Sequence, residues 1–214
     1  MLKVSNAAVE DLRYLLGRGY RRASAVRFVG DKYILDKPQR LLLYRCVYPI
    51  SIARAHWEKL IDPNELGKAN LSIDGFNVLW TINSAINGRP IFLGDDHFVR
   101  DISIAKGKPS ACEFAETINL VMQAISKLSP LFSRFVFDRP ISRSGEISSK
   151  VREALSVNSL SGNAITSQNA DVEVLKTYSI VASSDSVIID KAMRLFDLGG
   201  YVVENILRID PIKI

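Results

Sequence analysis

From residue 70 onward, short apolar runs rich in valine, isoleucine and phenylalanine alternate with segments of helical periodicity. The strand-like runs are LSID at 71–74, PIFLGDD at 90–96, RFVFD at 134–138, NAIT at 163–166, SIVASSD at 179–185 and YVVENIL at 201–207. Helical patterns occupy residues 77–86, 111–128, 144–155, 169–178 and 186–200. Strands that alternate with helices form a mostly parallel sheet with helices on both faces. We therefore expect an α/β fold for residues 68–214.

The first 67 residues differ, because they have helical patterns throughout. Four helical segments are expected, and the polar stretch DPNELGKAN at 62–70 follows them as a boundary. Their signals are a serine suited to an N-cap, glycines that interrupt or end helices, and a proline in a first helical turn. These residues are Ser5, Gly17, Gly19, Gly30 and Pro38. We expect a helical module over residues 1–67 joined to the α/β domain.

The net positive charge of the chain lies in this module. Residues 1–67 hold 12 basic and 7 acidic residues, a net charge of +5, whereas residues 68–214 hold 16 of each. A basic surface beside a neutral domain favours a polyanionic partner such as RNA, although a solvated basic face would have the same composition. The candidate nucleic-acid-binding residues bracket a glycine-containing turn: Arg13, Arg18, Arg21, Arg22 and Arg27.

Several classes of protein do not fit the sequence. No apolar run approaches the roughly 20 residues of a membrane span, and the start of the chain is too polar for a signal peptide, so we expect no membrane partner. Phosphate-loop, dinucleotide-binding and nucleophile-elbow motifs are missing. Cys46 and Cys112 form no CxxC motif and no Cys/His cluster, which favours a reducing cytoplasm and leaves a single disulfide between them open.

Three of the expected strands stop on an aspartate: Asp74, Asp138 and Asp185. The carboxyl ends of parallel strands share one edge of a sheet, where ligand crevices form. Each aspartate alone is well suited to cap the next helix. Together, however, clustered carboxylates repel one another, which favours a raised pKa or a bound cation. Because hard divalent ions prefer oxygen ligands, the pattern indicates a metal site at this edge.

Further acidic residues surround these three. Asp171 opens an expected helix just before the strand that ends at Asp185, and Asp190 is expected to face away at the surface. The stretch GDDHFVRD follows another apolar run and contributes Asp95, Asp96 and Asp101.

The remaining candidates have weaker signals. Asn77 lies near the first helical turn after Asp74, where its amide either orients a water or phosphate or shapes the turn. His56 and His97 are expected at the surface, and Trp57 and Trp80 in the core.

The segment IDGFNVL at 73–79 resembles the opening motif of the NYN branch of PIN-like nucleases, in which an IDG-N strand end supplies the first catalytic acid. VFD at 136–138, NAD at 169–171 and ASSDS at 182–186 follow in the order and spacing of the remaining acids. The basic N-terminal part is similar to an uncharacterised archaeal family that joins such a helical segment to a PIN-like domain. That family carries a DD…RD element, matched here by Asp95, Asp96, Arg100 and Asp101.

The resemblance implies a PIN-like three-layer sandwich, RNA as partner, and hydrolysis of RNA by a metal-activated water. The acids named above would hold Mg²⁺ or Mn²⁺ against the scissile phosphate: Asp74, Asp138 and Asp185 first, with Asp171, Asp96 and Asp101 as further candidates. A homodimer is compatible with the sequence. One position departs from the NYN pattern, because Val187 stands where a second aspartate is usual. This departure favours an alternative, a non-catalytic RNA-binding or ribosome-associated protein that keeps the fold.

Overall fold

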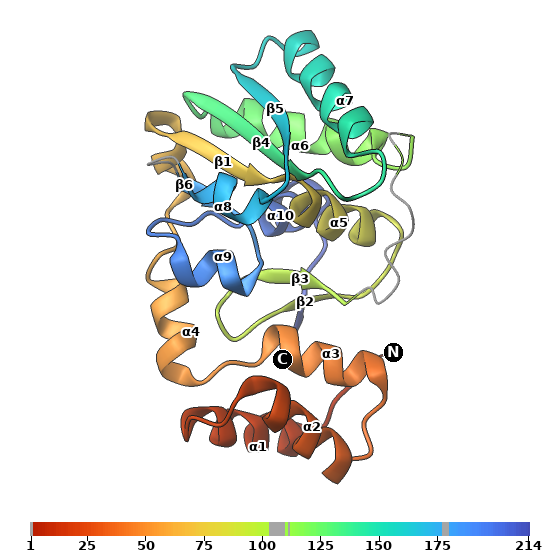
Figure 1. Ribbon diagram of the computed structural model, residues 1–214, viewed down its shortest axis with the longest axis vertical. Helices are drawn as coiled ribbons and strands as arrows, with labels where there is room; N and C mark the ends of the chain where they lie inside the picture. The colour runs from red at the N-terminus through yellow and green to blue at the C-terminus, as the bar shows by residue number, and fades with distance from the viewer. Residues whose placement is uncertain (1, 103–109, 111, 177–179) are drawn as a thin grey trace.

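The computed structural model describes residues 2–102, 110, 112–176 and 180–214. Its main sheet is all-parallel, in the order β5 (Gly162–Ser167), β4 (Phe132–Asp138), β1 (Asn70–Asp74) and β6 (Ile180–Ala182). Ile73 of β1 lies opposite Phe135 of β4 and Ala182 of β6, so the carboxyl ends of these strands meet at one edge (Figure 1). The expected α/β fold with a parallel sheet is confirmed.

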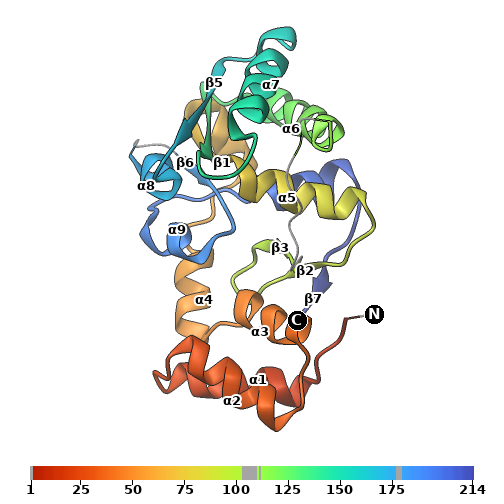
Figure 2. The same ribbon diagram turned by 45° about the vertical axis from the view of Figure 1, so that its right-hand side comes forward.

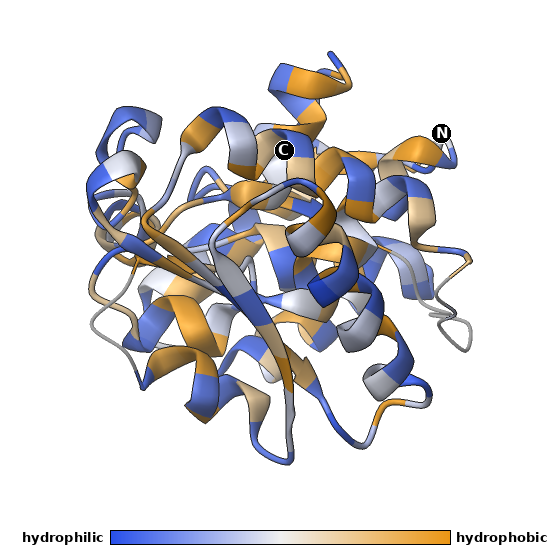
Figure 3. Ribbon diagram, turned by 90° about the horizontal axis from the view of Figure 1, so that it is seen from above, coloured by the Kyte–Doolittle hydropathy of each residue, from blue (hydrophilic) through white to orange (hydrophobic). Residues whose placement is uncertain are grey.

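Helices cover both faces of this sheet. On one face α5 (Gly75–Ile86), α6 (Ala115–Leu128) and α7 (Ser144–Val157) pack against Phe135 and Phe137. On the other, α8 (Ala170–Leu175) and α9 (Ser186–Lys191) pack against Val136 and Val181. Successive side chains of a strand point to opposite faces, which is why the neighbours in β4 enter different clusters. Figure 3 shows hydrophobic and hydrophilic residues interleaved along the covering helices.

A second, smaller sheet lies between the main sheet and the N-terminal helices. It consists of β3 (Val99–Asp101), β2 (Ile91–Leu93) and β7 (Ile212–Lys213), with β2 antiparallel to β3 and parallel to β7. The apolar run at 90–96 therefore forms a hairpin outside the parallel sheet, at the place where Figure 2 labels β2, β3 and β7.

Two expectations for the C-terminal part were wrong. The expected strand at 201–207 is helical, because α10 (Leu198–Tyr201) continues into the π-helical turn η2 (Val202–Ile206). Val202 and Val203 are fully buried there, and a short apolar run cannot by itself separate a strand from a buried helix. The expected helix at 186–200 ends at Lys191, and Leu195 then bridges to Leu60 and Val181.

The N-terminal module contains α1 (Asn6–Gly17), α2 (Arg22–Lys32), α3 (Lys37–Cys46) and α4 (Ile50–Trp57), followed by the 3₁₀ helix η1 (Pro63–Lys68). Two expected signals are confirmed, because Ser5 caps α1 and Pro38 lies in the first turn of α3. The expected break at Gly30 was wrong, since α2 continues to Lys32. Gly30 instead leaves room for the guanidinium of Arg40, which would lie 2.5 Å from a Cβ at this position.

The two ends of the chain help to join the module to the body. Ile214, just after β7, packs against the core of the helical module, where Figures 1 and 2 place the C-terminus beside α3. Leu2 and Val4 pack with Phe92 of β2 and Leu42 of α3.

The structure bears on two further expectations, which concern membrane-spanning helices and a disulfide between the two cysteines. Among the described residues, no helix is both long enough and apolar enough to cross a membrane. Cys46 is buried and Cys112 is exposed, and both are free, so the disulfide that the sequence left open does not form.

Candidate functional site

Asp74 is the last residue of β1 and the N-cap of α5. Its carboxylate accepts a hydrogen bond from the N–H of Asn77 at 3.4 Å and one from the hydroxyl of Ser183 at 2.8 Å. The residue is only 8% exposed, and burial raises its pKa to about 7. Within this net shift, the carboxylates of Asp185 and Asp138 also raise the pKa, whereas the two hydrogen bonds lower it. Asp74 therefore caps a helix and also lies among other carboxylates.

Gly75 allows the sharp change from β1 to α5. A Cβ at this position would lie 2.3 Å from the ring of Phe137, the penultimate residue of β4. Glycine therefore lets the start of α5 rest directly on the neighbouring strand. This contact keeps Asp74 at the strand end, beside the end of β4.

The loop after β6 consists of Ser183, Ser184 and Asp185. Asp185 caps α9 by accepting from the N–H of Val187 at 2.8 Å, and its own N–H donates to Ser183 Oγ at 3.1 Å. Ser184 donates both its N–H and its hydroxyl to Asn77 Oδ1, at 2.9 and 3.0 Å. Asn77 thus holds this loop against α5, and its side-chain oxygen is taken up by that contact.

Asp138 and Asp171 form the other part of the group. Asp138 ends β4 and is half-buried; burial raises its pKa, and the nearby carboxylate of Asp171 raises it further. Asp171 lies exposed in the first turn of α8. The structure therefore brings four predicted residues to one edge of the sheet: Asp74, Asp138, Asp171 and Asp185.

The chemistry of these donors fits a hard divalent cation. Mg²⁺ is usually held by one or two carboxylates and keeps several of its waters. A bound cation would also reverse the repulsion by which Asp185 and Asp138 raise the pKa of Asp74. Within the described ranges, no three His, Cys, Asp or Glu side chains are grouped so that they could ligate one ion. A divalent cation at this edge would therefore be ligated by a pair of carboxylates, and water molecules would supply its remaining ligands.

Asp96 and Asp101 take part in a different set of contacts, around the hairpin of β2 and β3. Asp96 is fully buried and accepts from two nitrogens of Arg100, at 2.6 and 2.7 Å. Burial opposes its ionisation, but Arg100 outweighs burial and lowers the pKa of Asp96 to about 2. Asp101 lies 3.5 Å from Arg45 and accepts a hydrogen bond from Ser84. Because both carboxylates are taken up by these contacts, we leave them out of the metal-ligand set.

The five candidate arginines divide into two groups. Arg13 donates to Asp95 through two nitrogens, and this hydrogen bonding raises the pKa of the guanidinium. Arg22 donates to the backbone carbonyls of Tyr44 and Val47, at 2.7 and 2.8 Å. The remaining three are exposed and form no ion pair with any carboxylate in the described part of the chain: Arg18, Arg21 and Arg27.

The expectations for His56 and Trp57 were wrong. His56 is buried, with Nδ1 3.1 Å from Asp96 Oδ2 and Nε2 2.7 Å from Oδ1 of the exposed Asp190. Ala53, three residues earlier in α4, is also buried, and this helical spacing was the signal for an inward-facing histidine. Trp57 is 54% exposed and stacks on His97, with ring centroids 4.9 Å apart.

Two family models match the sequence. A domain of unknown function (DUF5616) matches residues 63–201, and a protein of unknown function (DUF434) matches residues 6–59. An uncharacterized protein of Methanocaldococcus jannaschii is 34% identical over 182 residues, which cover 85% of this chain and 87% of that protein. No solved structure matches the chain. The expected similarity to uncharacterised archaeal proteins is confirmed, whereas neither matching model names a PIN-like nuclease, so that resemblance stays a prediction.

Proposed function

We propose that this chain, which belongs to the DUF5616 family, is a metal-dependent ribonuclease that hydrolyses phosphodiester bonds of RNA. The observation that carries the proposal is the burial of Asp74 beside Asp185 and Asp138 at the carboxyl edge of the parallel sheet. Burying a carboxylate is costly unless a positive charge accompanies it. In the described part of the chain, the hydrogen-bond partners of Asp74 are neutral, so a cation from solution would supply that charge.

The proposed direct ligands of Mg²⁺ or Mn²⁺ are the paired carboxylates of Asp74 and Asp185, and Asp138 would contact the ion through one of its coordinated waters. Such an ion, when bound, lowers the pKa of a coordinated water and neutralises charge on a phosphate. Ser183 orients the carboxylate of Asp74 through its hydroxyl. We assign to Asp171, which is exposed beside Asp138, the role of accepting a proton from the attacking water.

RNA would be retained by the helical module. Three arginines there are exposed and unpaired with carboxylates in the described ranges: Arg18, Arg21 and Arg27. Helices α1 and α2 and the turn between them also carry three aromatic side chains that are 59–63% exposed: Tyr14, Tyr20 and Phe28. Guanidinium groups neutralise phosphates and aromatic rings stack on unpaired bases, so this combination favours a single strand.

Cleavage assays with mixed RNAs and Mn²⁺ test the enzymatic proposal. The parent protein should cleave, and Asp74→Asn should cleave roughly a hundredfold more slowly or worse, because it removes a charge that holds the ion. Asp210→Asn is the matched control, since it removes an exposed acid that belongs to no candidate site, and it should retain the parent's rate. Equal cleavage by the parent and Asp74→Asn would indicate a contaminating nuclease and overturn the proposal.

A second candidate function is RNA binding without cleavage. Val187, in the first turn of α9, is 48% exposed at the position where the NYN pattern has a second aspartate, and this favours a degenerate site. If the site is degenerate, Val187→Asp should create or increase Mn²⁺-dependent cleavage. If neither the parent nor Val187→Asp cleaves RNA, and the parent binds RNA in a salt-dependent way, RNA binding without cleavage is established instead.

We also propose a cytoplasmic location, because both cysteines are free and Cys112 is exposed, which suits a reducing compartment. A homodimer stays a prediction, which the mass of the purified protein in solution would test.

A further inference from the structure

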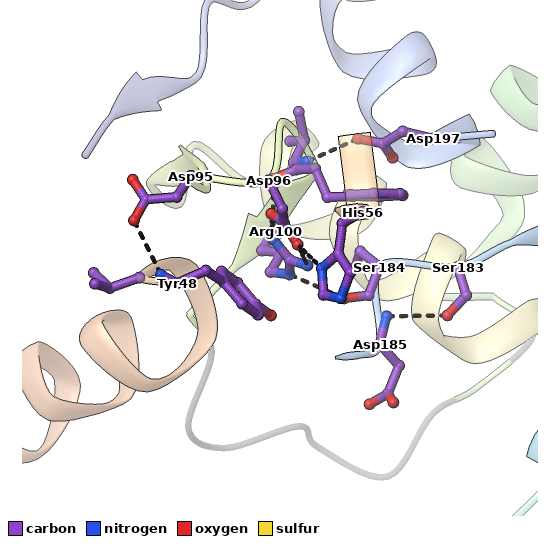
Figure 4. A network of polar contacts seen from close by, with 12 residues as sticks. Tyr48, His56, Asp95, Asp96, Arg100, Ser183, Ser184, Asp185 and Asp197 are labelled. Atoms are coloured by element: carbon purple, nitrogen blue, oxygen red, sulfur yellow. Dashed lines mark hydrogen bonds and ion pairs between the residues drawn. The ribbon is translucent and has the colours of Figure 1, made fainter. Parts of the chain in front are cut away.

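The DD…RD element links the hairpin of β2 and β3 to the candidate site through Arg100. This side chain is 1% exposed; it donates to both oxygens of Asp96, and its Nε donates to the backbone carbonyl of Ser184 at 2.9 Å (Figure 4). Gly94 makes room for the ion pair, because a Cβ there would lie 2.6 Å from Arg100 and 2.8 Å from Asp96. The buried pair therefore reaches directly to the loop after β6.

Ser184 is held from two sides. Arg100 binds its carbonyl, and Asn77 accepts from its N–H and its hydroxyl. The residue before it, Ser183, binds Asp74, and the residue after it is the candidate ligand Asp185. A change in the position of Ser184 would therefore disturb both proposed direct metal ligands, Asp74 and Asp185.

The helical module contacts the same network through α4. His56 lies between Asp96 and Asp190, at 3.1 and 2.7 Å. Three residues after His56, the ammonium of Lys59 donates to the carbonyls of Ile189 and Asp190, at 2.8 and 2.9 Å. Figures 1 and 2 both show α4 beside α9. The module thus forms hydrogen bonds with the carboxyl end of α9, the short helix whose N-cap is Asp185.

We propose that Arg100 and His56 are positioning residues, which act with Asp96 to fix the loop at residues 183–185 and so make the candidate metal site dependent on the helical module. The proposed effect on metal binding rests on the function proposed above, whereas the effect on the loop does not. A buried ion pair contributes little to stability compared with apolar packing, and it is better suited to fixing one geometry. The DD…RD element is therefore assigned to the support of the site.

The decisive variant replaces the ion pair as a whole, Arg100→Met with Asp96→Leu, so that no unpaired charge remains in the core. Thermal unfolding of this double variant should match that of the parent. The amide hydrogens of residues 183–187 should exchange about tenfold faster or more, because the Ser184 carbonyl loses its charged donor. Mn²⁺ affinity, measured by calorimetry, should fall about ten- to hundredfold, as it does when supporting groups of a metal site are removed.

Two further variants sharpen the test. Arg13→Met with Asp95→Leu is the matched control, since it removes an ion pair between the module and the same hairpin that does not contact Ser184. Its loop exchange and Mn²⁺ affinity should equal the parent's. His56→Phe keeps a ring in the same space without the contacts to Asp96 and Asp190, and it should speed exchange of the loop amides.

The outcomes separate the two proposals. Unchanged exchange at residues 183–187 in the Arg100→Met, Asp96→Leu variant overturns the positioning role, whatever the protein does with metal. Faster exchange in the Arg13→Met, Asp95→Leu control as well would also overturn it, since any disturbance of the hairpin would then suffice. A parent that binds no Mn²⁺ refutes the proposed metal site, and loop exchange still decides whether Arg100 holds Ser184.

Discussion

Asp74 shows why helix capping and cation binding are compatible in a strand-end aspartate. Oδ1 accepts from the N–H of Asn77, and Oδ2 accepts from the hydroxyl of Ser183. An ionised carboxylate offers about four acceptor positions, so a cap and a hydroxyl leave acceptor capacity on both oxygens. The sequence predicts the residue and its place at a strand end. It does not predict the burial of Asp74, because the covering residue Ser183 is more than a hundred positions away.

The stability of Asp74→Asn should depend on pH in a defined direction. Burial raises the pKa of Asp74 from 3.8 to about 7, so the folded protein keeps this proton while the unfolded chain loses it. Its contribution to the free energy of unfolding is full below pH 4 and is lost as pH rises towards 7. Relative to the parent, Asp74→Asn should therefore gain roughly 3 kcal/mol between pH 5 and pH 8, which urea denaturation would measure.

The pH dependence of Asp74→Asn has to be compared with that of the parent, because a second buried carboxylate, Asp197, titrates in the same range. Burial also raises the pKa of Asp197, to about 6, so the parent loses stability over the same pH range for a second reason. Both proteins share that loss, and it cancels in the comparison. A variant that gains nothing over the parent between pH 5 and pH 8 would contradict the assigned burial of the Asp74 carboxylate.

The turn between β1 and α5 depends on the contact between Gly75 and Phe137. Phe137 is fully buried, and its ring packs edge to face against Phe76, with centroids 5.1 Å apart. The ring therefore has little room to move away from a new methyl group on α5. The IDG motif is in this sense a packing requirement as well as the carrier of an acid.

Gly75→Ala should destabilise the protein by roughly 1–3 kcal/mol, because its Cβ would lie 2.3 Å from a ring atom of Phe137. Phe137→Leu, which shortens the opposing side chain, should relieve part of that clash. In chemical denaturation the double variant should lose less stability than the two single losses combined. Strict additivity would show that the two residues do not oppose each other as described.

Elements with local signals could be predicted from the sequence, and elements set by distant partners could not. Ser5 and Pro38 act within one helical turn, and both predictions are confirmed. The small sheet depends on pairing between Phe92 and Ile212, from opposite parts of the chain. Val202 and Val203 have strand-like composition, yet they are helical and are buried in two clusters formed with other helices and with strands of both sheets. Tertiary contacts override weak local preference in such runs.

Polar contacts join the helical module to the body at the hairpin. Arg13 pairs with Asp95, Arg45 pairs with Asp101, and His56 lies against Asp96. The partners are between 40 and 82 positions apart in the chain, so no local sequence pattern predicts these contacts. The composition of residues 1–67 indicated a basic module, but it could not separate arginines that bind the body from arginines that face solvent.

The distinction between arginines that contact the body and arginines that face solvent defines the test of RNA binding by the module. Replacing Arg18, Arg21 and Arg27 by Gln removes three exposed charges, so RNA affinity should fall, and the slope of log affinity against log salt should flatten by about 2. Lys68→Gln, Lys127→Gln and Lys150→Gln together remove the same charge from exposed positions outside the module and should leave the slope unchanged. Fluorescence anisotropy with a short single-stranded RNA at several salt concentrations measures both. Equal flattening in the two triple variants would mean that net charge alone attracts RNA, and an unchanged slope in both would exclude the module as the binding surface.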